Sequence, residues 1–387
     1  MRIVHVVDYL MPQMGYQEFL LPKWNAKHGH EVFIVTSDRY TPFNNYDETW
    51  GRTLGKRICG AGISKHEGVT IIRLPIFFEL KSRPLIRGLT KKVKELEPDL
   101  LLIHGTGSFS IYQCCLFLRK DNYPIFADNH MIVDIVQKGL IQTIYYFLHK
   151  CLMKFLLSKK VDKFFGVTTD SCNYLLNYEG VPSNKLELLP LGVDTEIFKP
   201  KVVKKNENDE IPIIIQSGKL NNDKKPQWLS DAAIILLKKG IKFKLKFIGN
   251  GSEKIINEIK QKFCKEGFES YLEIIDLMPL EDLAVEFSKA DLVIFPEGTS
   301  LSCIEAASCN TAVIMADLPA SLERERQGIG ITYERGNTTD LAKKILFLLN
   351  DSSKLRSLSI SSGEKARYLY SYNKISNRLV SFAKQNT

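Results

Sequence analysis

The sequence lacks the patterns that mark a secreted, membrane-spanning or zinc-binding protein. Its 8 cysteines are scattered over 387 residues, with no C-x-x-C pair and no histidine cluster at zinc spacing. We therefore expect free thiols in a reducing compartment. The first apolar stretch ends at Asp8, too soon for a signal peptide, and no window offers about 20 uninterrupted apolar residues. These absences predict a cytoplasmic protein, or one held peripherally at the inner face of a membrane.

No region of the chain holds an excess of one charge. Lys and Arg number 53 against 44 Asp and Glu, a formal net charge of +9, and both halves share the excess almost equally. A dedicated nucleic-acid binder would concentrate that excess on one module, so we expect no nucleic-acid partner. The even surplus suits a protein that handles anionic ligands or lies near an anionic surface.

Short apolar runs alternate with longer amphipathic stretches along the whole chain. Runs such as Glu31–Thr36 and Leu292–Phe295 are typical of strands buried on both faces of a parallel sheet, whereas Pro226–Lys239 has a helical pattern. The repetition predicts a doubly wound α/β fold. The polar segment Lys201–Glu210 predicts a linker between two halves, each of the size of one Rossmann-like domain.

The strongest motif is a pair of glutamates separated by seven residues. Glu297 and Glu305 follow the strand Leu292–Phe295, and we expect a helix to begin near Ser300 or Leu301. Ligands bind at the carboxyl ends of parallel strands, and helix N-termini attract phosphate. Glu305, just over one turn inside the helix, can accept both hydroxyls of a ribose, while Glu297 lies nearer a reacting sugar. The alternative is two surface glutamates at a chance spacing.

A second motif places two cations in one loop. The buried strand Ile211–Gln216 leads to Gly218, and Lys219 and Lys224 follow before the next helix. Two cations suit a diphosphate, and the glycine allows close backbone approach. The alternative is a solvated lysine loop. At the boundary between the halves, Gly192 permits a tight turn, unless this segment is an ordinary linker.

In this order and spacing, the motifs resemble those of retaining family 4 glycosyltransferases, a GT-B group that uses nucleotide-sugar donors. The resemblance extends over essentially the whole chain and includes Gly29–Val32, Phe247–Gly251, Ala290–Pro296 and Tyr372–Phe382. It implies two Rossmann-like domains facing a cleft, with the acceptor on residues 1–195 and the donor on residues 208–370. Residues 371–387 would form a helix that crosses back and packs on the N-terminal domain.

The resemblance also implies a role for each matching residue. The donor-binding residues would be Gly15, Gly218, Lys219, Lys224, Met278, Ser300, Leu301 and Glu305, and the catalytic residues Glu297, His130 and Lys224. The lysines would hold the diphosphate, Met278 would face the nucleobase, and His130 would reach the donor sugar. For His130 a structural, hydrogen-bonded histidine remains the alternative. Lys219 stands where the family usually has Arg, and Ser300 where Gly is common, so the donor's identity stays open.

The resemblance implies transfer with retention and without a metal or other cofactor, because lysines and helix N-termini can neutralise a leaving diphosphate. The chain contains no Asp-x-Asp, and no strand is followed by the G-x-G-x-x-G of nicotinamide enzymes. We expect a hexosyltransferase-type enzyme acting on a saccharide or lipid-linked acceptor, in polysaccharide, glycolipid or lipid-linked glycan synthesis. The alternatives are a sugar-nucleotide epimerase and a non-catalytic subunit that binds a nucleotide sugar or lipid.

Two basic segments leave contact with an anionic membrane surface open. Residues 135–161 contain no acidic residue; they carry Lys138, Lys150, Lys154, Lys159 and Lys160, and apolar residues from Ile141 to Phe155 on one helical face. They predict either a helix on a membrane surface or a helix packed against the N-terminal domain. The segment Lys81–Lys92 either contacts an anionic acceptor or lipid headgroups, or is solvated.

Overall fold

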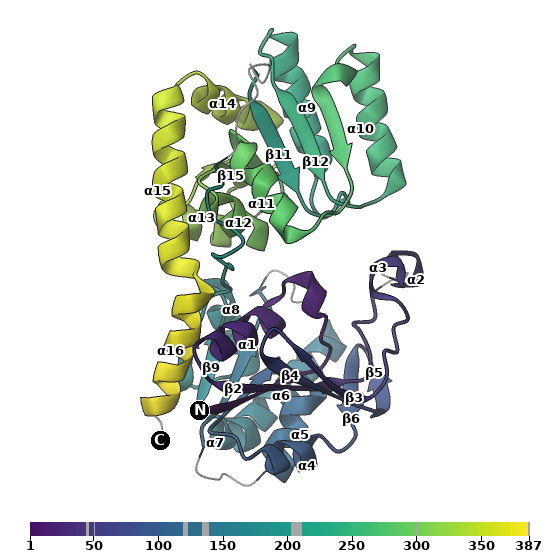
Figure 1. The fold of residues 1–387 in the computed structure, drawn as a ribbon, viewed down its shortest axis with the longest axis vertical. Coiled ribbons are helices and arrows are strands. Elements are labelled where there is room, and N and C mark those ends of the chain that lie inside the picture. Colours follow the sequence, from purple (N-terminus) through teal and green to yellow (C-terminus); the bar gives the residue numbers. More distant parts are fainter. Residues whose placement is uncertain are drawn as a thin grey trace. The chain divides into compact units, whose positions relative to one another are not determined.

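The structure is a computed structural model that describes residues 1–43, 46–49, 51–118, 123–133, 139–202, 211–298 and 300–385. It divides into two compact units, one formed by Met1–Gly192 and Tyr372–Thr387, the other by Val193–Ser371. Each unit is an α/β structure with a largely parallel sheet between helices, as Figure 1 shows. The fold class predicted from the apolar runs is confirmed. Most of the predicted linker Lys201–Glu210 lies outside the described residues.

Within the described residues, the sheet of the first unit has eight strands in the order β10-β9-β8-β7-β1-β2-β4-β3. The strands are β1 (Arg2–Val7), β2 (Glu31–Ser37), β3 (Gly62–His66), β4 (Val69–Leu74), β7 (Leu100–His104), β8 (Ile125–Asn129), β9 (Lys163–Gly166) and β10 (Leu186–Leu188). Only the edge strand β3 is antiparallel among these described strands. A separate antiparallel hairpin is formed by β5 (Ile76–Leu80) and β6 (Arg83–Ile86).

Helices cover both faces of this first sheet. The helices of the first unit are α1 (Gln17–Lys27), α2 (Tyr46–Thr49), α3 (Gly51–Leu54), α4 (Leu89–Leu96), α5 (Phe109–Phe117), α6 (Leu140–Leu152), α7 (Ser158–Lys160), α8 (Thr169–Tyr174) and α16 (Tyr372–Gln385), of which α2 and α3 lie away from the sheet. Ile3 of β1 packs in an apolar cluster with α1 and α16, and the next residue, Val4, packs in a cluster with α4 and α5. Consecutive strand residues are therefore both buried, which explains the continuous apolar runs.

The second unit contains a six-stranded sheet among its described residues, in the order β13-β12-β11-β14-β15-β16, and every neighbouring pair is parallel. Its strands are β11 (Ile213–Ser217), β12 (Lys244–Ile248), β13 (Leu272–Ile275), β14 (Leu292–Phe295), β15 (Ala312–Ala316) and β16 (Ile331–Tyr333). Its helices are α9 (Pro226–Lys238), α10 (Glu253–Lys265), α11 (Leu280–Lys289), α12 (Leu301–Ser308), α13 (Pro319–Arg326), α14 (Thr338–Leu349) and α15 (Ser352–Tyr370).

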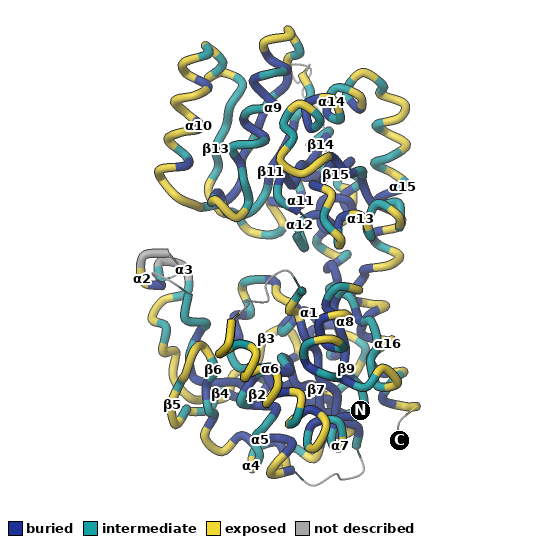
Figure 2. Tube along the Cα trace, turned by 180° about the vertical axis from the view of Figure 1, so that it is seen from behind, coloured by how far each residue is buried: buried dark blue, intermediate teal, exposed yellow. Residues whose placement is uncertain are grey.

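The core of the second unit also has two layers. Ile214 of β11 packs with α9, α10 and α14, whereas Ile215 packs with α11 and α12 on the other face. In Figure 2 the strands β7 and β14 are drawn in the colour of buried residues. Two covered faces hold each sheet rigidly, so the loops at the carboxyl ends of the strands start from fixed positions.

Candidate functional site

The point where a ligand is expected in the second unit lies between β11 and β14. These strands are neighbours, and the chain continues from β11 toward one edge of the sheet and from β14 toward the other. A crevice forms at such a switch point, outside the carboxyl ends of the strands. The loops that follow these two strands, together with the helix α12 after the second, carry most of the predicted donor-binding residues.

The loop after β11 combines an open glycine with two lysines. Gly218 has a φ of +123°, and a Cβ there would meet no atom within 4 Å, so the backbone conformation alone favours glycine. Lys219 follows directly, and Lys224 precedes α9. Lys225 has a φ of +47°, a left-handed conformation that side chains rarely adopt. Lys225 thus has a backbone conformation that glycine adopts more readily than lysine does.

The neighbouring loop between β12 and α10 supports the shape of this lysine loop. The amide of Leu220 donates to the carbonyl oxygen of Asn250 at 2.9 Å. A Cβ at Gly249 would overlap the carbonyl oxygen of Gly218, and one at Gly251 would overlap that of Leu220. Only glycine fits at either position, because backbone atoms cannot move aside as a flexible side chain can.

The environment of Lys224 connects the two site loops. Burial lowers the pKa of its ammonium group; the carboxylates of Asp223 and Glu297 oppose this shift, and the charge of Lys219 adds to it. The loops after β11 and β14 therefore lie within electrostatic reach of each other. A bound anion would stabilise the charge that burial disfavours at this lysine.

An arginine that the sequence analysis did not predict holds the carboxylate of Glu297. Arg335 donates from Nε to Oε1 of Glu297 at 2.8 Å, and its Nη2 contacts the same oxygen. The Glu297 side chain is 13% exposed, and among the described residues its buried Oε2 has no hydrogen-bond partner. Because a buried acceptor without a partner is costly, this oxygen suits a ligand hydroxyl.

Side chains from later elements fix the loop after β14. The hydroxyl of Tyr333, at the end of β16, donates to the carbonyl oxygen of Pro296 at 2.5 Å. Arg324 of α13 donates from Nη1 to the carbonyl oxygen of Ser300 at 2.8 Å. Gly298 has a φ of +75°, which favours glycine. The sequence analysis missed Tyr333 and Arg324, because their contribution depends on how distant segments pack.

The helix α12 begins at Leu301, where the sequence analysis expected it. Ser300 is the residue before its first turn, and within the described residues no side chain caps this end. The first N–H groups of a helix have no partner inside the helix and attract anions. Glu305 lies just over one turn further on and is 7% exposed.

Glu305 is a buried carboxyl group with an altered pKa. Burial raises its pKa to about 7, and the hydroxyl of Ser302 opposes the shift. In the ligand-free protein this carboxyl is therefore partly protonated near neutral pH. Hydroxyl donors from a ligand would stabilise its ionised form.

We expect Glu305→Gln to remove a pH dependence of stability. The folded pKa, about 7, lies above the ordinary value of 4.5, so the contribution of Glu305 to stability is full below pH 4.5 and is lost as pH rises to about 7. Relative to wild type, the variant should gain about 2–3 kcal/mol between pH 5 and pH 8, measured by urea unfolding without ligand. Glu281→Gln, at an exposed glutamate, is the control. If the free energies of unfolding of wild type and variant differed by the same amount at pH 5 and at pH 8, the expectation would be contradicted.

Met278 lies at the same edge of the second sheet, in the loop between β13 and α11. It is partly buried against the apolar cluster of α11 and α12, whereas its neighbour Leu277 is 54% exposed. The strands are parallel, so this loop opens at the same edge as the loops that carry Lys224 and Glu297.

Gly15 and His130 belong to the first unit. Gly15 ends a short helical turn after β1, with a φ of +65°, and leads into α1. His130 directly follows β8; its side chain is 36% exposed, and its Nε2 lies 3.9 Å from Oδ2 of Asp128. Partial desolvation lowers the pKa of His130, but Asp128 raises it more strongly, so the net shift is upward.

Asp128 is the centre of a buried polar cluster that the sequence analysis did not predict. It is 1% exposed; its Oδ2 lies 2.7 Å from Nδ1 of His104 and accepts a hydrogen bond from Nε2 of Gln17 at 3.2 Å. Burial alone would raise its pKa, but His104 and His130 hold the pKa of Asp128 far below its usual range. The other ring nitrogen of His104 lies 3.1 Å from His5. The ionised carboxylate therefore orients the histidines around it.

A cavity of about 440 Å³ opens beside Asp128 and His130 in the first unit. Its wall includes aromatic rings and carboxyl groups, among them Tyr9, Tyr145, Tyr174, Asp8, Glu18 and Glu179. Burial raises the pKa of Asp8 to about 7, while a hydrogen bond from Ser110 and the charge of Arg83 oppose the shift. Rings beside hydrogen-bond acceptors suit a ligand with apolar faces and hydroxyl edges, as sugars have.

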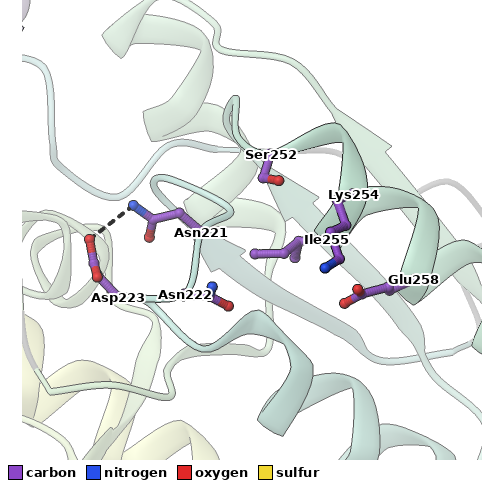
Figure 3. Close-up of a pocket in the computed structure, with 7 residues that line it drawn as sticks. All are labelled: Asn221, Asn222, Asp223, Ser252, Lys254, Ile255 and Glu258. Carbon is purple, nitrogen blue, oxygen red and sulfur yellow. Dashed lines mark hydrogen bonds between the residues drawn. The ribbon is translucent and has the colours of Figure 1, made fainter. Parts of the chain in front are cut away.

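Another cavity, of about 320 Å³, lies between the β11–α9 loop and the start of α10 (Figure 3). Its lining consists of Asn221, Asn222, Asp223, Ser252, Lys254, Ile255 and Glu258. The side chain of Asn221 donates to Oδ2 of Asp223 at 3.3 Å. Lys224 and Glu297 do not line it, so this cavity is separate from the predicted donor-binding residues.

The described residues include neither a metal-ligating cluster nor a membrane-spanning helix. No group of three or more His, Cys, Asp and Glu side chains in this part of the chain is arranged to hold a metal ion. None of the helices described here combines the length and the apolar character needed to cross a membrane.

The chain is similar to known glycosyltransferases over nearly its whole length. The family model Glycosyltransferase Family 4 matches residues 23–197, and the model Glycosyl transferases group 1 matches residues 198–365. No curated protein matches the chain significantly.

Solved structures share the fold at low sequence identity. A sucrose-phosphate synthase from Thermosynechococcus elongatus is 16% identical, with 99% of this chain and 98% of that chain covered and a TM-score of 0.72. A glycosyltransferase from Rickettsia africae is 15% identical, with 100% and 98% covered and a TM-score of 0.73. Anabaena HepE in complex with UDP is 13% identical, with 100% of both chains covered and a TM-score of 0.73. The chain therefore belongs to the GT-B glycosyltransferases, with a family 4 N-terminal region and a group 1 C-terminal region.

Proposed function

We propose that this protein transfers a sugar from a nucleotide-diphosphate sugar to an acceptor hydroxyl, with retention of anomeric configuration. The observation that supports this most is the grouping of Lys219, Lys224 and Glu297 at the switch point of the second unit, beside the start of α12. Anabaena HepE, which shares the fold, was solved in complex with UDP and with UDP-glucose. A uridine-diphosphate sugar is therefore the first donor to test.

In this proposal the lysine loop binds the diphosphate. Lys219 and Lys224 pair with its oxygens through charge-assisted hydrogen bonds, and Gly218 lets the backbone come close. The amides of Ser300 and Leu301, at the start of α12, donate to the phosphate or the sugar. These cations and dipoles neutralise the leaving group, so the proposal includes no metal or other cofactor.

The remaining predicted residues bind the nucleoside and the transferred sugar. Glu305 accepts the ribose hydroxyls and Met278 faces the nucleobase. The free Oε2 of Glu297 accepts a hydroxyl of the transferred sugar, and His130 donates to that sugar. The bond from the anomeric carbon to the diphosphate oxygen breaks, and a bond to the acceptor oxygen forms on the same face. The acceptor's proton passes to the leaving diphosphate.

The acceptor binds, in this proposal, in the cavity beside Asp128. Four carboxyl groups line that cavity, those of Asp8, Glu18, Asp128 and Glu179, and the arginine in its wall is Arg83. A lining with several carboxyl groups repels an anionic ligand. We therefore propose an acceptor saccharide whose sugar unit in the cavity is neutral or cationic.

Incubation with donor tests the proposal. Nucleoside diphosphates are first screened for stabilisation, because a ligand that binds only the native state raises the melting temperature. The matching nucleotide sugar is then incubated with and without saccharide acceptors, and the anomeric configuration of the product is read by NMR. A new nucleotide sugar formed without acceptor would instead indicate an epimerase. Stabilisation without turnover of any acceptor would favour a non-catalytic binding subunit.

We expect the two glutamates to affect different kinetic constants. Glu305→Ala should raise KM at least fivefold with little change in kcat, because the ribose does not react and its binding is uniform along the reaction. Glu297→Ala should lower kcat at least fivefold, because it contacts the sugar whose charge changes. Steady-state kinetics with varied donor concentration separates them.

The matched variants Glu305→Gln and Glu297→Gln keep the size of each side chain and remove only its charge. They show whether charge or shape matters at each position. The reverse pattern, with Glu305 affecting kcat and Glu297 affecting KM, would contradict the assignment.

A further inference from the structure

The first unit exposes apolar side chains on two elements that are distant in sequence. On β5, Phe77 is 63% exposed, and Phe78 and Leu80 are also exposed. On α6, Ile141 is 76% exposed, and Ile144, Leu148 and Leu152 are exposed on the same face. Figure 2 shows the exposed residues along both elements. Clusters of exposed apolar residues mark interaction surfaces.

The exposed face of α6 is the apolar face that the sequence analysis singled out. The side that packs inward carries instead His149, whose Nδ1 lies 2.6 Å from the hydroxyl of Tyr112. Beyond α6 the chain continues in a π-helical turn, Met153–Leu157, in which Phe155 is 64% exposed. α6 therefore packs on the first unit through the side that carries His149 and Tyr146, as one interpretation expected, but its apolar stripe stays exposed.

One contact links the hairpin directly to α6, and another links it to α5. The guanidinium of Arg83, on β6, lies over the ring of Tyr145, on α6, at 5.9 Å. Phe78 of β5 makes an edge-on contact with Phe109 at the start of α5, 6.0 Å between ring centres. We call the exposed apolar residues of β5, of α6 and at Phe155 the docking surface.

Cations surround the docking surface, and acidic residues are absent from much of it. Residues 139–160 contain no Asp or Glu. The exposed cations are Lys81, Arg87, Lys150, Lys154 and Lys159. Lys154 stacks on Phe155 at 5.6 Å, and Arg87 on Phe77 at 5.8 Å. Lys138, which the sequence analysis grouped with these residues, lies outside the described residues.

Part of the basic segment Lys81–Lys92 lies on α4 and forms ion pairs there. Lys91 and Lys92 belong to α4, where both pair with Glu95. Glu79 of β5 pairs with Arg57. The cations that remain near the docking surface are therefore those of the hairpin and of the α6 segment.

We propose that the docking surface binds the anionic face of a lipid bilayer. Apolar side chains at a helix surface enter the interface between headgroups and acyl chains, while lysines extend their charges to lipid phosphates. Each cation near such a surface strengthens binding by about fivefold, and salt screens the effect. A protein partner fits less well, because lysine is depleted at protein–protein interfaces.

The docking surface also borders the cavity of the first unit, because Arg83 and Tyr145 belong to the cavity wall. A glycolipid could leave its acyl chains in the bilayer while its saccharide enters the cavity. This consequence rests on the proposed function; the binding of the bilayer does not.

Vesicle co-sedimentation of the full chain tests the proposal. Phosphatidylcholine vesicles are compared with vesicles that also contain phosphatidylglycerol, at low and high salt. The test variant combines Ile144→Glu with Lys154→Glu. The matched control combines Ile63→Glu with Lys65→Glu, which are exposed residues of the edge strand β3. Turnover of a water-soluble acceptor is measured for each protein, because neither pair belongs to the proposed site.

We expect wild type and control to bind only the anionic vesicles and to be released by salt. The test variant should bind at least tenfold more weakly, with turnover of the soluble acceptor unchanged. Equal binding by the test variant, or no binding of wild type to anionic vesicles, would overturn the proposal. So would a wild-type dimer in solution that the test variant dissociates, because the surface would then be an interface between copies. A lack of turnover in all proteins would count against the proposed function alone.

Discussion

Lys224→Ala should lower kcat/KM for the nucleotide sugar at least tenfold. Charge-assisted hydrogen bonds are worth about 1.5–3 kcal/mol each, and the partial burial of this lysine removes competing water. Its lowered pKa shows that the folded chain holds an ammonium group where a charge is disfavoured. A diphosphate would supply the missing opposite charge, so the binding energy should be large at this position. Steady-state kinetics and a titration with the nucleoside diphosphate both measure the loss.

The neighbouring lysine provides a matched control. Lys225→Gly removes a charge one residue away, and glycine accepts the φ of +47° found there. The side chain of Lys225 lies over the ring of Trp228 at 5.9 Å. We expect the control to stay within threefold of wild type. Near wild-type turnover in Lys224→Ala, with a large loss in the control, would assign the diphosphate contact to Lys225.

Asp128→Asn should destabilise the first unit by about 1–3 kcal/mol, because the neutral amide no longer provides the charged acceptor that His104 and Gln17 contact in the interior. Asp128 is ionised at neutral pH and lies 2.7 Å from His104 and near His130. Its low pKa stabilises the fold above pH 3.8, the ordinary value, and this contribution is lost as pH falls further. Urea unfolding at neutral pH measures the difference.

Two further measurements separate this role from a general loss of folding. Asp47→Asn changes an exposed aspartate of the same unit and should leave stability within 0.5 kcal/mol, the usual range for surface substitutions. In the folded fraction of Asp128→Asn, NMR titration should show the pKa of His130 falling, because Asp128 raises it. An unchanged pKa and unchanged stability would show that Asp128 is not the group that orients these histidines.

Apolar runs predicted the strands well because both sheets are covered on two faces. Among the described strands, β3, β5 and β6 were not predicted: β3 is an edge strand whose residues are all exposed, and β5 and β6 form a hairpin outside the main sheet. Such strands do not need continuous apolar residues. The same reasoning applies to α6, whose apolar face is exposed, so a pattern of residues alone did not distinguish a core face from a surface one.

The candidate site was predictable where a motif lies in one loop, and not where distant segments meet. Lys224 and Glu305 stand in local motifs, whereas Arg335 reaches Glu297 from the loop after β16.

The glycine at position 192 also shows what a local sequence pattern cannot predict. The sequence analysis attributed Gly192 to a tight turn, but a Cβ there would lie 2.6 Å from the ring of Tyr372. The need for glycine at position 192 therefore comes from packing against Tyr372, 180 positions further along the chain. No local sequence pattern reveals such a contact.

The lysine loop takes its shape from backbone atoms of the neighbouring loop. Gly249 and Gly251 press against the carbonyl oxygens of Gly218 and Leu220, and no side chain of the lysine loop takes part in that contact. Evolution can therefore exchange the loop's side chains, as with Lys219 in place of the usual arginine, without rebuilding its scaffold. If the loop binds the donor as proposed, single substitutions can alter donor preference while Gly249 and Gly251 keep the shape of the loop. The side chains of the lysine loop can therefore change without any change in the glycines that support its backbone.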